Sequence, residues 1–325
     1  MPKTLKVSVI IPSRNEQFMA RTVNDVLAKA RGDVEVLVGL DGYWPVPVTH
    51  GDGTTHEVDW RDPRVHAVHF GAPQGMRTVI NACARVATGD FLMKLDAHCM
   101  LAEGYDVALQ EECDRQTVVV PRRYSLDPEN WKFKETGKKP VDYHYLSWPY
   151  EADRPGVGLH GTVWTKRAHE RQDILIDEEM SSQGSCWFMQ RKYFNRHIGP
   201  LDTDRYGNFV QEFQEIGLKA WLGGGRVLVN KKTWYAHLHK GKEYGRGYFI
   251  SKGEMARGAQ AAVDYWMFDE WTQRVHDIKW LIERFWPVPH WPTNWEQLRH
   301  EARFPGGPEA LKAAKREKEV VGAAP

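Results

Sequence analysis

Short runs of β-branched and other apolar residues alternate with helix-length segments along the first part of the chain. The runs at 7–12, 34–42, 65–70 and 91–95 predict buried strands. The segments at 17–30 and 75–86 predict helices. Strands that alternate with helices in this way predict a largely parallel sheet with helices on its faces, which is an α/β fold.

The periodic pattern fails between Tyr124 and Met180 and then returns. A helix over 101–115 and a strand over 117–123 are predicted before the break. The segments predicted after it are strands at 184–190, 226–229 and 234–240 and a helix at 212–222. Tryptophan-rich helices are predicted from 249 to about 303, and the tail over 312–325 is expected to be frayed.

The composition narrows the class of protein. With 325 residues, 42% hydrophobic and 27% charged, the chain resembles a globular protein large enough for one α/β domain with appendages. No apolar run approaches the ~20 residues that span a bilayer, and the first residues lack a signal-peptide core, so we expect a cytoplasmic protein. The four cysteines lack CxxC spacing, which favours reduced thiols. A net charge of +1 gives no general attraction to nucleic acid.

The strand at 91–95 is followed by Asp96, Ala97 and His98. Side chains two residues apart at the end of a strand share one face, so Asp96 and His98 could bind one cation. Ligands of open α/β sheets bind at the carboxyl ends of parallel strands, which is where this pair would lie. The alternative is a surface turn with an incidental histidine.

The order of these motifs resembles a GT-A-type glycosyltransferase of family 2, and within it most closely the polypeptide N-acetylgalactosaminyltransferase branch. The segments that carry this resemblance are the first strand and its continuation (7–16), the Asp-x-His at 96–98, the loop and Lys-Tyr-Phe at 184–194, the acidic helix at 212–221 and Ala236-His237. The likeness covers roughly residues 7–123 and 181–246. It implies a GT-A domain over 1–248, and it divides this domain into a nucleotide-binding half (1–123), an acceptor-side insert (124–180) and a metal and acceptor half (181–248). A Trp-rich helical extension over 249–325 would follow.

The resemblance implies that Asp96, His98 and His237 bind a divalent metal, with His239 as an alternative third ligand. Two imidazoles suit Mn²⁺ better than Mg²⁺, which prefers oxygen ligands. The donor would be a UDP-sugar, and a metal ion would neutralise its diphosphate. The expected donor-binding residues are Pro12, Ser13, Arg14, Glu16, Asp41, Arg77, Asp96, Gly184, Ser185, Lys240, Lys242 and Arg246. Simpler roles are a turn cap for Asp41, an exposed helix position for Arg77 and a helix-start acid for Glu16.

Glu212 is the expected catalytic residue. Inverting members of the family carry an Asp after this Glu, and here Phe213 follows it. The N-acetylgalactosaminyltransferase branch also lacks an acid at this position and retains configuration, so retention is mildly favoured. A role of Glu212 as general base stays open.

The sequence does not identify the acceptor. The options are a protein, a small molecule, a lipid-linked intermediate and a DNA base. A hydroxylated DNA base is the main alternative acceptor, because aromatic and basic residues mix in the insert. In that case Trp131 and Trp148 would stack on an extruded base. The residues that would contact phosphates are Arg122, Arg123, Lys132, Lys134, Lys138 and Lys139. Two other classes are a non-catalytic nucleotide-sugar binder and a Rossmann oxidoreductase, the latter weakened by the missing GxGxxG.

Overall fold

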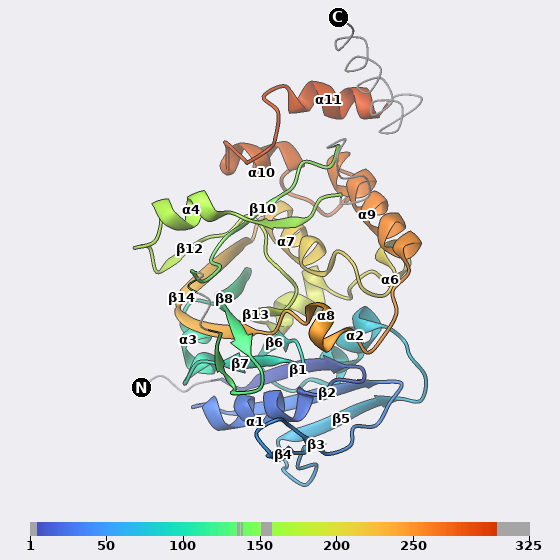
Figure 1. The fold of residues 1–325 in the computed structure, drawn as a ribbon. Helices are drawn as coiled ribbons and strands as arrows, with labels where there is room; N and C mark the ends of the chain where they lie inside the picture. Colours follow the sequence, from blue (N-terminus) through green and yellow to red (C-terminus); the bar gives the residue numbers. More distant parts are fainter. Residues whose placement is uncertain (1–4, 135–136, 138, 151–157, 304–325) are drawn as a thin grey trace, which may run out of the picture.

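The computed structural model describes residues 5–134, 137, 139–150 and 158–303, without the side chain of Lys242. In the described part, one ten-stranded sheet runs through the molecule with its strands in the order β12-β14-β8-β13-β6-β1-β2-β5 (Figure 1). Its parallel part contains β1 (Val7–Ser13), β2 (Val34–Asp41), β5 (Val65–Phe70) and β6 (Phe91–Leu95). The other strands on this path are β8 (Thr117–Asp127), β12 (Ile176–Glu178), β13 (Cys186–Gln190) and β14 (Arg226–His237). The remaining two strands, β7 (Cys99–Leu101) and β9 (Lys132–Phe133), pair with β14 and β8 beside this path. The predicted α/β class is confirmed, but the expected largely parallel arrangement holds only for part of the sheet, because β7, β9, β12 and β13 pair antiparallel.

Helices cover both faces of the sheet. The alternation along β1 sends Val7, Val9 and Ile11 to one apolar cluster and Ile10 to the other. The helices α1 (Met19–Lys29) and α3 (Tyr105–Glu111) pack into the first cluster. The second cluster contains α2 (Met76–Val86) and α7 (Glu212–Leu222). The sheet is therefore buried on both sides, as its apolar strands predict.

A short strand, β7 (Cys99–Leu101), occupies the place where the sequence predicts the start of a helix. It pairs antiparallel with the end of β14, and the helix α3 begins only at Tyr105, after Gly104 in a left-handed conformation. The predicted helix over 101–115 is therefore wrong in its first residues. Three residues are too few for a strand to give a clear periodic signal, and long-range pairing decides their conformation.

The insert is built from short elements rather than from one long loop. These elements are β9 (Lys132–Phe133), β10 (His144–Leu146), β11 (Gly161–Val163), α4 (Thr165–Glu170) and β12. The buried aromatic residues of this region are Tyr143, Tyr145, Trp148, Tyr150 and Trp164. They belong to the same apolar cluster as α2 and α7, so packing explains most of the aromatic content of the insert.

The C-terminal region forms the helices α9 (Lys252–Met267), α10 (Ile278–Arg284) and α11 (Trp295–Ala302), as predicted. They lie at the end of the molecule far from β2 and β5 (Figure 1). Trp266, Trp271 and Trp291 are buried in the cluster that contains α7. The indole N–H of Trp291 donates to the carbonyl of Leu146 in the insert at 2.7 Å. The tail predicted over 312–325 lies outside the described residues.

Smaller elements complete the described chain. They are β3 (Val48–Thr49), β4 (Thr55–His56), α5 (Arg191–Tyr193), a π-helical turn (Phe194–Ile198), α6 (Thr203–Tyr206) and α8 (Gly241–Tyr244). None of the described helices has the length and apolarity needed to cross a bilayer.

A fully buried arginine joins α2 to α7. Arg77 forms an ion pair with Glu215 of α7, and its guanidinium donates to the carbonyl of Val210. The guanidinium also lies 4.9 Å from the ring centroid of Tyr206. Arg77 therefore holds the segment that leads into α7, and this segment positions Glu212.

We predict that Arg77→Met lowers the free energy of unfolding by about 3 kcal/mol, because removing one partner of a buried ion pair leaves the other charge without compensation. Chemical denaturation would measure the loss. Arg226→Met removes an exposed ion pair with Asp114 and is the matched control, with an expected loss below about 1 kcal/mol. Equal losses in the two variants would contradict the anchoring role of Arg77.

Candidate active site

A cleft of about 1010 Å³ opens at the carboxyl ends of β1, β2 and β6. Its other walls are the start of α7, the segment after β14 and residues 248–259. The expected donor-binding residues that line it are Pro12, Ser13, Arg14, Glu16, Asp41, Asp96, Gly184, Ser185, Lys240 and Arg246. The structure therefore brings these residues together in one cleft.

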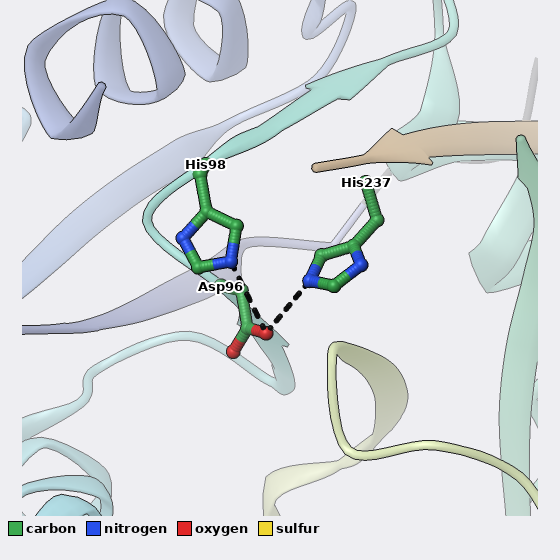
Figure 2. A group of neighbouring side chains, drawn as sticks. All are labelled: Asp96, His98 and His237. Atoms are coloured by element: carbon green, nitrogen blue, oxygen red, sulfur yellow. Dashed lines mark hydrogen bonds and ion pairs between the residues drawn. The ribbon is translucent and has the colours of Figure 1, made fainter. Parts of the chain in front are cut away.

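Asp96, His98 and His237 converge inside this cleft, and both imidazoles point toward the Asp96 carboxylate (Figure 2). The Oδ2 atom of Asp96 lies 3.1 Å from Nε2 of His237 and 3.9 Å from Nε2 of His98. One ligand atom from each residue falls within 4.8 Å of the other two. The spacing of the three side chains is thus compact enough for one metal ion.

The pairing of β7 with β14 produces this arrangement. His237 is the last residue of β14 and lies opposite Cys99 in the ladder, so it comes beside His98. The backbone N–H of Leu238 also donates to the carbonyl of His98 at 3.2 Å. The two imidazole centroids are 5.0 Å apart as a result. Among the described residues, the group that could hold a metal contains His237 and not His239.

The chemistry of these three residues fits a divalent transition metal. Burial lowers the pKa of His237 to about 3, so its imidazole is neutral at pH 7, and one of its two ring nitrogens has a lone pair. Burial alone would raise the pKa of Asp96, but Lys94 and the hydrogen bond from His237 hold it well below its usual range. One carboxylate and two imidazoles form a suitable donor set for Mn²⁺ or Zn²⁺.

Glu16 stands behind this cluster, although the sequence suggested a direct contact with the donor. Its Oε2 lies 3.3 Å from Nδ1 of His98, and its Oε1 accepts from Lys240. This carboxylate lies on the Nδ1 side of His98, while Nε2 faces Asp96. A carboxylate in that position favours a proton on Nδ1. Burial alone would raise the pKa of Glu16, but His98 and Lys240 lower it.

The ends of β1 and β2 form the part of the cleft expected to take the nucleoside. The Asp41 carboxylate accepts from the backbone N–H groups of Gln74 and Gly75, and Arg14 lies 3.9 Å from it. Asp41 therefore caps this turn and lines the cleft at the same time. Ser13 bonds through its hydroxyl to Tyr43.

One expected donor residue is not brought to the cleft by the structure, and the side chain of another is not described. Arg77 is fully buried between α2 and α7 and is absent from the cleft lining, so it stabilises the fold and does not reach a donor. The family resemblance suggested a donor contact, with an exposed helix position as the simpler alternative, and the buried partner Glu215 could not be foreseen. The side chain of Lys242 lies outside the described residues. Arg246 does line the cleft and lies over the ring of Phe209, 5.4 Å from its centroid.

Glu212 begins α7 at the base of the cleft and is almost completely buried. Its Oε1 accepts from the indole N–H of Trp187 at 2.8 Å, and its Oε2 lies 3.3 Å from Nζ of Lys94. Burial raises the pKa of Glu212, against the opposing charge of Lys94. A held carboxylate in this position could orient a bound sugar or accept a proton.

The sequence did not predict that Lys94 and residues 248–255, the outer wall of the cleft, belong to the site. Lys94 was read only as part of an apolar strand, although a lone charge within such a run is itself a signal. The outer wall contains Tyr248, Phe249, Ile250 and Met255, of which Phe249 is 89% exposed. The sequence pattern gave no means of placing these residues over the cleft.

Two arginines and two tryptophans that were expected to contact DNA instead contact other residues of the protein or are buried. Arg122 forms a two-pronged pair with Asp142, and Arg123 donates to Gln183. Trp148 is buried, while Trp131 donates to Asp25. Lys132, Lys134 and Lys139 are exposed, and Lys138 lies outside the described residues. The aromatic residues therefore serve packing in this conformation.

Known proteins match this chain in both sequence and fold. Residues 8–199 match the family described as Glycosyl transferase family 2. The chain is 22% identical over 273 residues to Probable N-acetylgalactosaminyltransferase 7 of Caenorhabditis elegans, which covers 81% of this chain and 44% of the relative. It is 24% identical over 220 residues to Polypeptide N-acetylgalactosaminyltransferase 4 of Mus musculus, which covers 66% and 35%. The chain thus spans less than half the length of these relatives.

A solved structure shares the architecture. The crystal structure of GalNAc-T7 with UDP, GalNAc and Mn²⁺ matches with a TM-score of 0.58 and 16% identity, over 82% of this chain and 50% of that chain. This match confirms the GT-A fold, and the relatives confirm the resemblance to the N-acetylgalactosaminyltransferases. Because the family match covers more than half of its 325 residues, the chain belongs to glycosyl transferase family 2.

Proposed function

We propose that the chain transfers a sugar from a UDP-sugar to a hydroxyl group of an acceptor, with a divalent metal, preferably Mn²⁺, held by Asp96, His98 and His237. The observation that carries this proposal is the convergence of these three side chains in one cleft with Glu212. The crystal structure of GalNAc-T7 supports this proposal, because it contains UDP, GalNAc and Mn²⁺.

The residues of the cleft divide into donor, metal and transfer groups. The strand ends with Arg14 and Asp41 would hold the nucleoside, and Lys240 and Arg246 would face the diphosphate. A divalent cation would supply Lewis-acid charge neutralisation of the leaving diphosphate. During transfer, the bond from the anomeric carbon to the diphosphate oxygen would break, a bond to the acceptor oxygen would form, and the proton of the acceptor hydroxyl would pass to the leaving diphosphate.

Glu212 would act at the transferred sugar, and we place retention ahead of inversion. Phe213, at the position of the base in inverting members, is buried in the apolar cluster beside α7 and offers no proton acceptor. Both oxygens of Glu212 already have partners in Trp187 and Lys94, which suits a carboxylate that orients a sugar.

The acceptor would enter along the outer wall over residues 248–255. Aromatic and aliphatic side chains predominate there, which suits a protein segment or a small molecule with an apolar group beside its hydroxyl. DNA is not put forward, because the arginines and tryptophans that it required are engaged elsewhere.

Incubation with a panel of UDP-sugars and Mn²⁺ tests the proposed function. Transferases of this kind hydrolyse their donor slowly when no acceptor is present, so one UDP-sugar should release UDP in a manner that EDTA abolishes. Absence of binding and of hydrolysis for every donor would favour another nucleotide or no catalysis at all.

We predict that Asp96→Ala and His237→Ala each abolish Mn²⁺-dependent donor hydrolysis, because each removes one of three metal ligands. UDP release with increasing Mn²⁺ is the measurement. The control is His197→Ala, at an exposed histidine of the π-helical turn that is absent from the cleft lining. Undiminished metal-dependent hydrolysis in either ligand variant would show that the metal lies elsewhere.

We predict that Glu212→Gln reduces turnover by about a hundredfold, because the neutral amide no longer holds the sugar as the carboxylate would, and a misplacement of about 1 Å at the reacting centre can cost that much. The amide oxygen can still accept from Trp187, so the fold should survive. Turnover is measured as UDP release at saturating donor, with thermal unfolding to check the fold. A folded variant with a near-normal rate would leave Glu212 with a structural role only.

A further inference from the structure

Lys94 is a buried charge in the centre of the sheet, directly beneath the cleft. It is the fourth residue of β6, whose five residues are all buried, and only 1% of Lys94 is exposed. Its Nζ donates to Oδ1 of Asp96 at 2.6 Å and to the carbonyl of Gly184, and it lies 3.3 Å from Oε2 of Glu212. A buried ammonium is retained where acceptors surround it, as they do here.

The contact with Lys94 divides the two oxygens of Asp96 between different partners. Oδ1 accepts from Lys94, while Oδ2 faces Nε2 of His237 at 3.1 Å and Nε2 of His98 at 3.9 Å. Rotation of the carboxylate would break the contact with Lys94. Asp96 therefore presents one oxygen to the two histidines and keeps the other away from them.

Lys94 also holds Glu212, on the other side of the cleft, through a direct contact. Glu212 is fixed between Lys94 and Trp187, and any side chain at position 184 would overlap the Glu212 carboxylate. Gly184 thus allows this close approach, and its carbonyl is itself bound by Lys94. One ammonium group connects the end of β6, the loop before β13 and the start of α7.

We propose that Lys94 is a positioning residue that limits Asp96 to a single metal-facing oxygen and fixes Glu212 in the cleft, while its charge weakens metal binding. This inference rests on the metal site of the proposed function. The ammonium and the metal would contact different oxygens of the Asp96 carboxylate. Two positive charges on one carboxylate repel each other, even where water partly screens them.

The change in metal affinity on loss of Lys94 distinguishes a positioning role from a merely structural role. Loss of structure would weaken both metal binding and turnover. Loss of the Lys94 charge removes the repulsion and frees Oδ1 of Asp96, so it should strengthen metal binding while it disorders Glu212 and slows turnover. The two measurements are thus expected to change in opposite directions.

The test compares Lys94→Met and Lys94→Arg with the wild-type protein. Calorimetric titration with Mn²⁺ alone gives the Kd, and donor hydrolysis gives kcat and KM. We expect Lys94→Met to bind Mn²⁺ at least about threefold more tightly and to lose at least about tenfold in kcat, with a smaller change in KM. Lys94→Arg keeps the charge and should stay closer to wild type in both. Lys94→Gln, which is neutral but keeps a donor, takes the place of Lys94→Met if that variant does not fold.

Lys231 provides the matched control. It is also a buried lysine, on β14, and its ammonium donates to the carbonyl of Arg171 at 2.7 Å, outside the cleft lining. Lys231→Met should change thermal stability without changing the Kd for Mn²⁺. Unchanged or weaker Mn²⁺ binding in a folded neutral variant of Lys94 would overturn the role of Lys94 and leave the metal site standing. Failure of the wild-type protein to bind Mn²⁺ would overturn the metal site, and this inference with it.

Discussion

The antiparallel pairing of β7 with the end of β14 is the contact on which the candidate site depends. It joins a turn after β6 to the last residue of a strand more than a hundred positions later, and so places His237 beside His98. The ladder has few residues, but each side chain in it has a fixed face, and a slip of one residue would turn His237 away from Asp96. The geometry of the candidate metal site is thus set by backbone hydrogen bonds rather than by the histidines themselves.

The buried charged groups Lys94 and Glu16 of the cleft each contact groups of opposite charge. Lys94 lies between Asp96 and Glu212, and Glu16 lies between His98 and Lys240. Such compensation allows several ionised groups to remain in a site shielded from water. It also couples the groups, because movement of one ion changes the field at its neighbours.

The parts of this site that the sequence predicted lie at the ends of clear periodic elements. Asp41, Asp96 and Glu212 follow or begin segments whose apolar pattern is unambiguous, and the structure brings all three to the cleft. What the sequence could not predict depends on contacts between distant segments. The strand β7 is too short to have a pattern, and the burial of Arg77 depends on Glu215 of another helix. Trp131 and Trp148 suggested a ligand surface, but Trp148 packs against Trp291 of the C-terminal region and Trp131 donates to Asp25.

The continuous apolar cluster has a consequence for how this enzyme could be divided. Trp266, Trp271 and Trp291 share one core with Trp221 of α7, and the insert is bound to the same core through Leu146. A shortened chain that ended near residue 248 would expose this apolar face to water and leave the helix that carries Glu212 without its outer support. Residues 249–303 therefore cover one side of the hydrophobic core, and a fragment that keeps this core must include them.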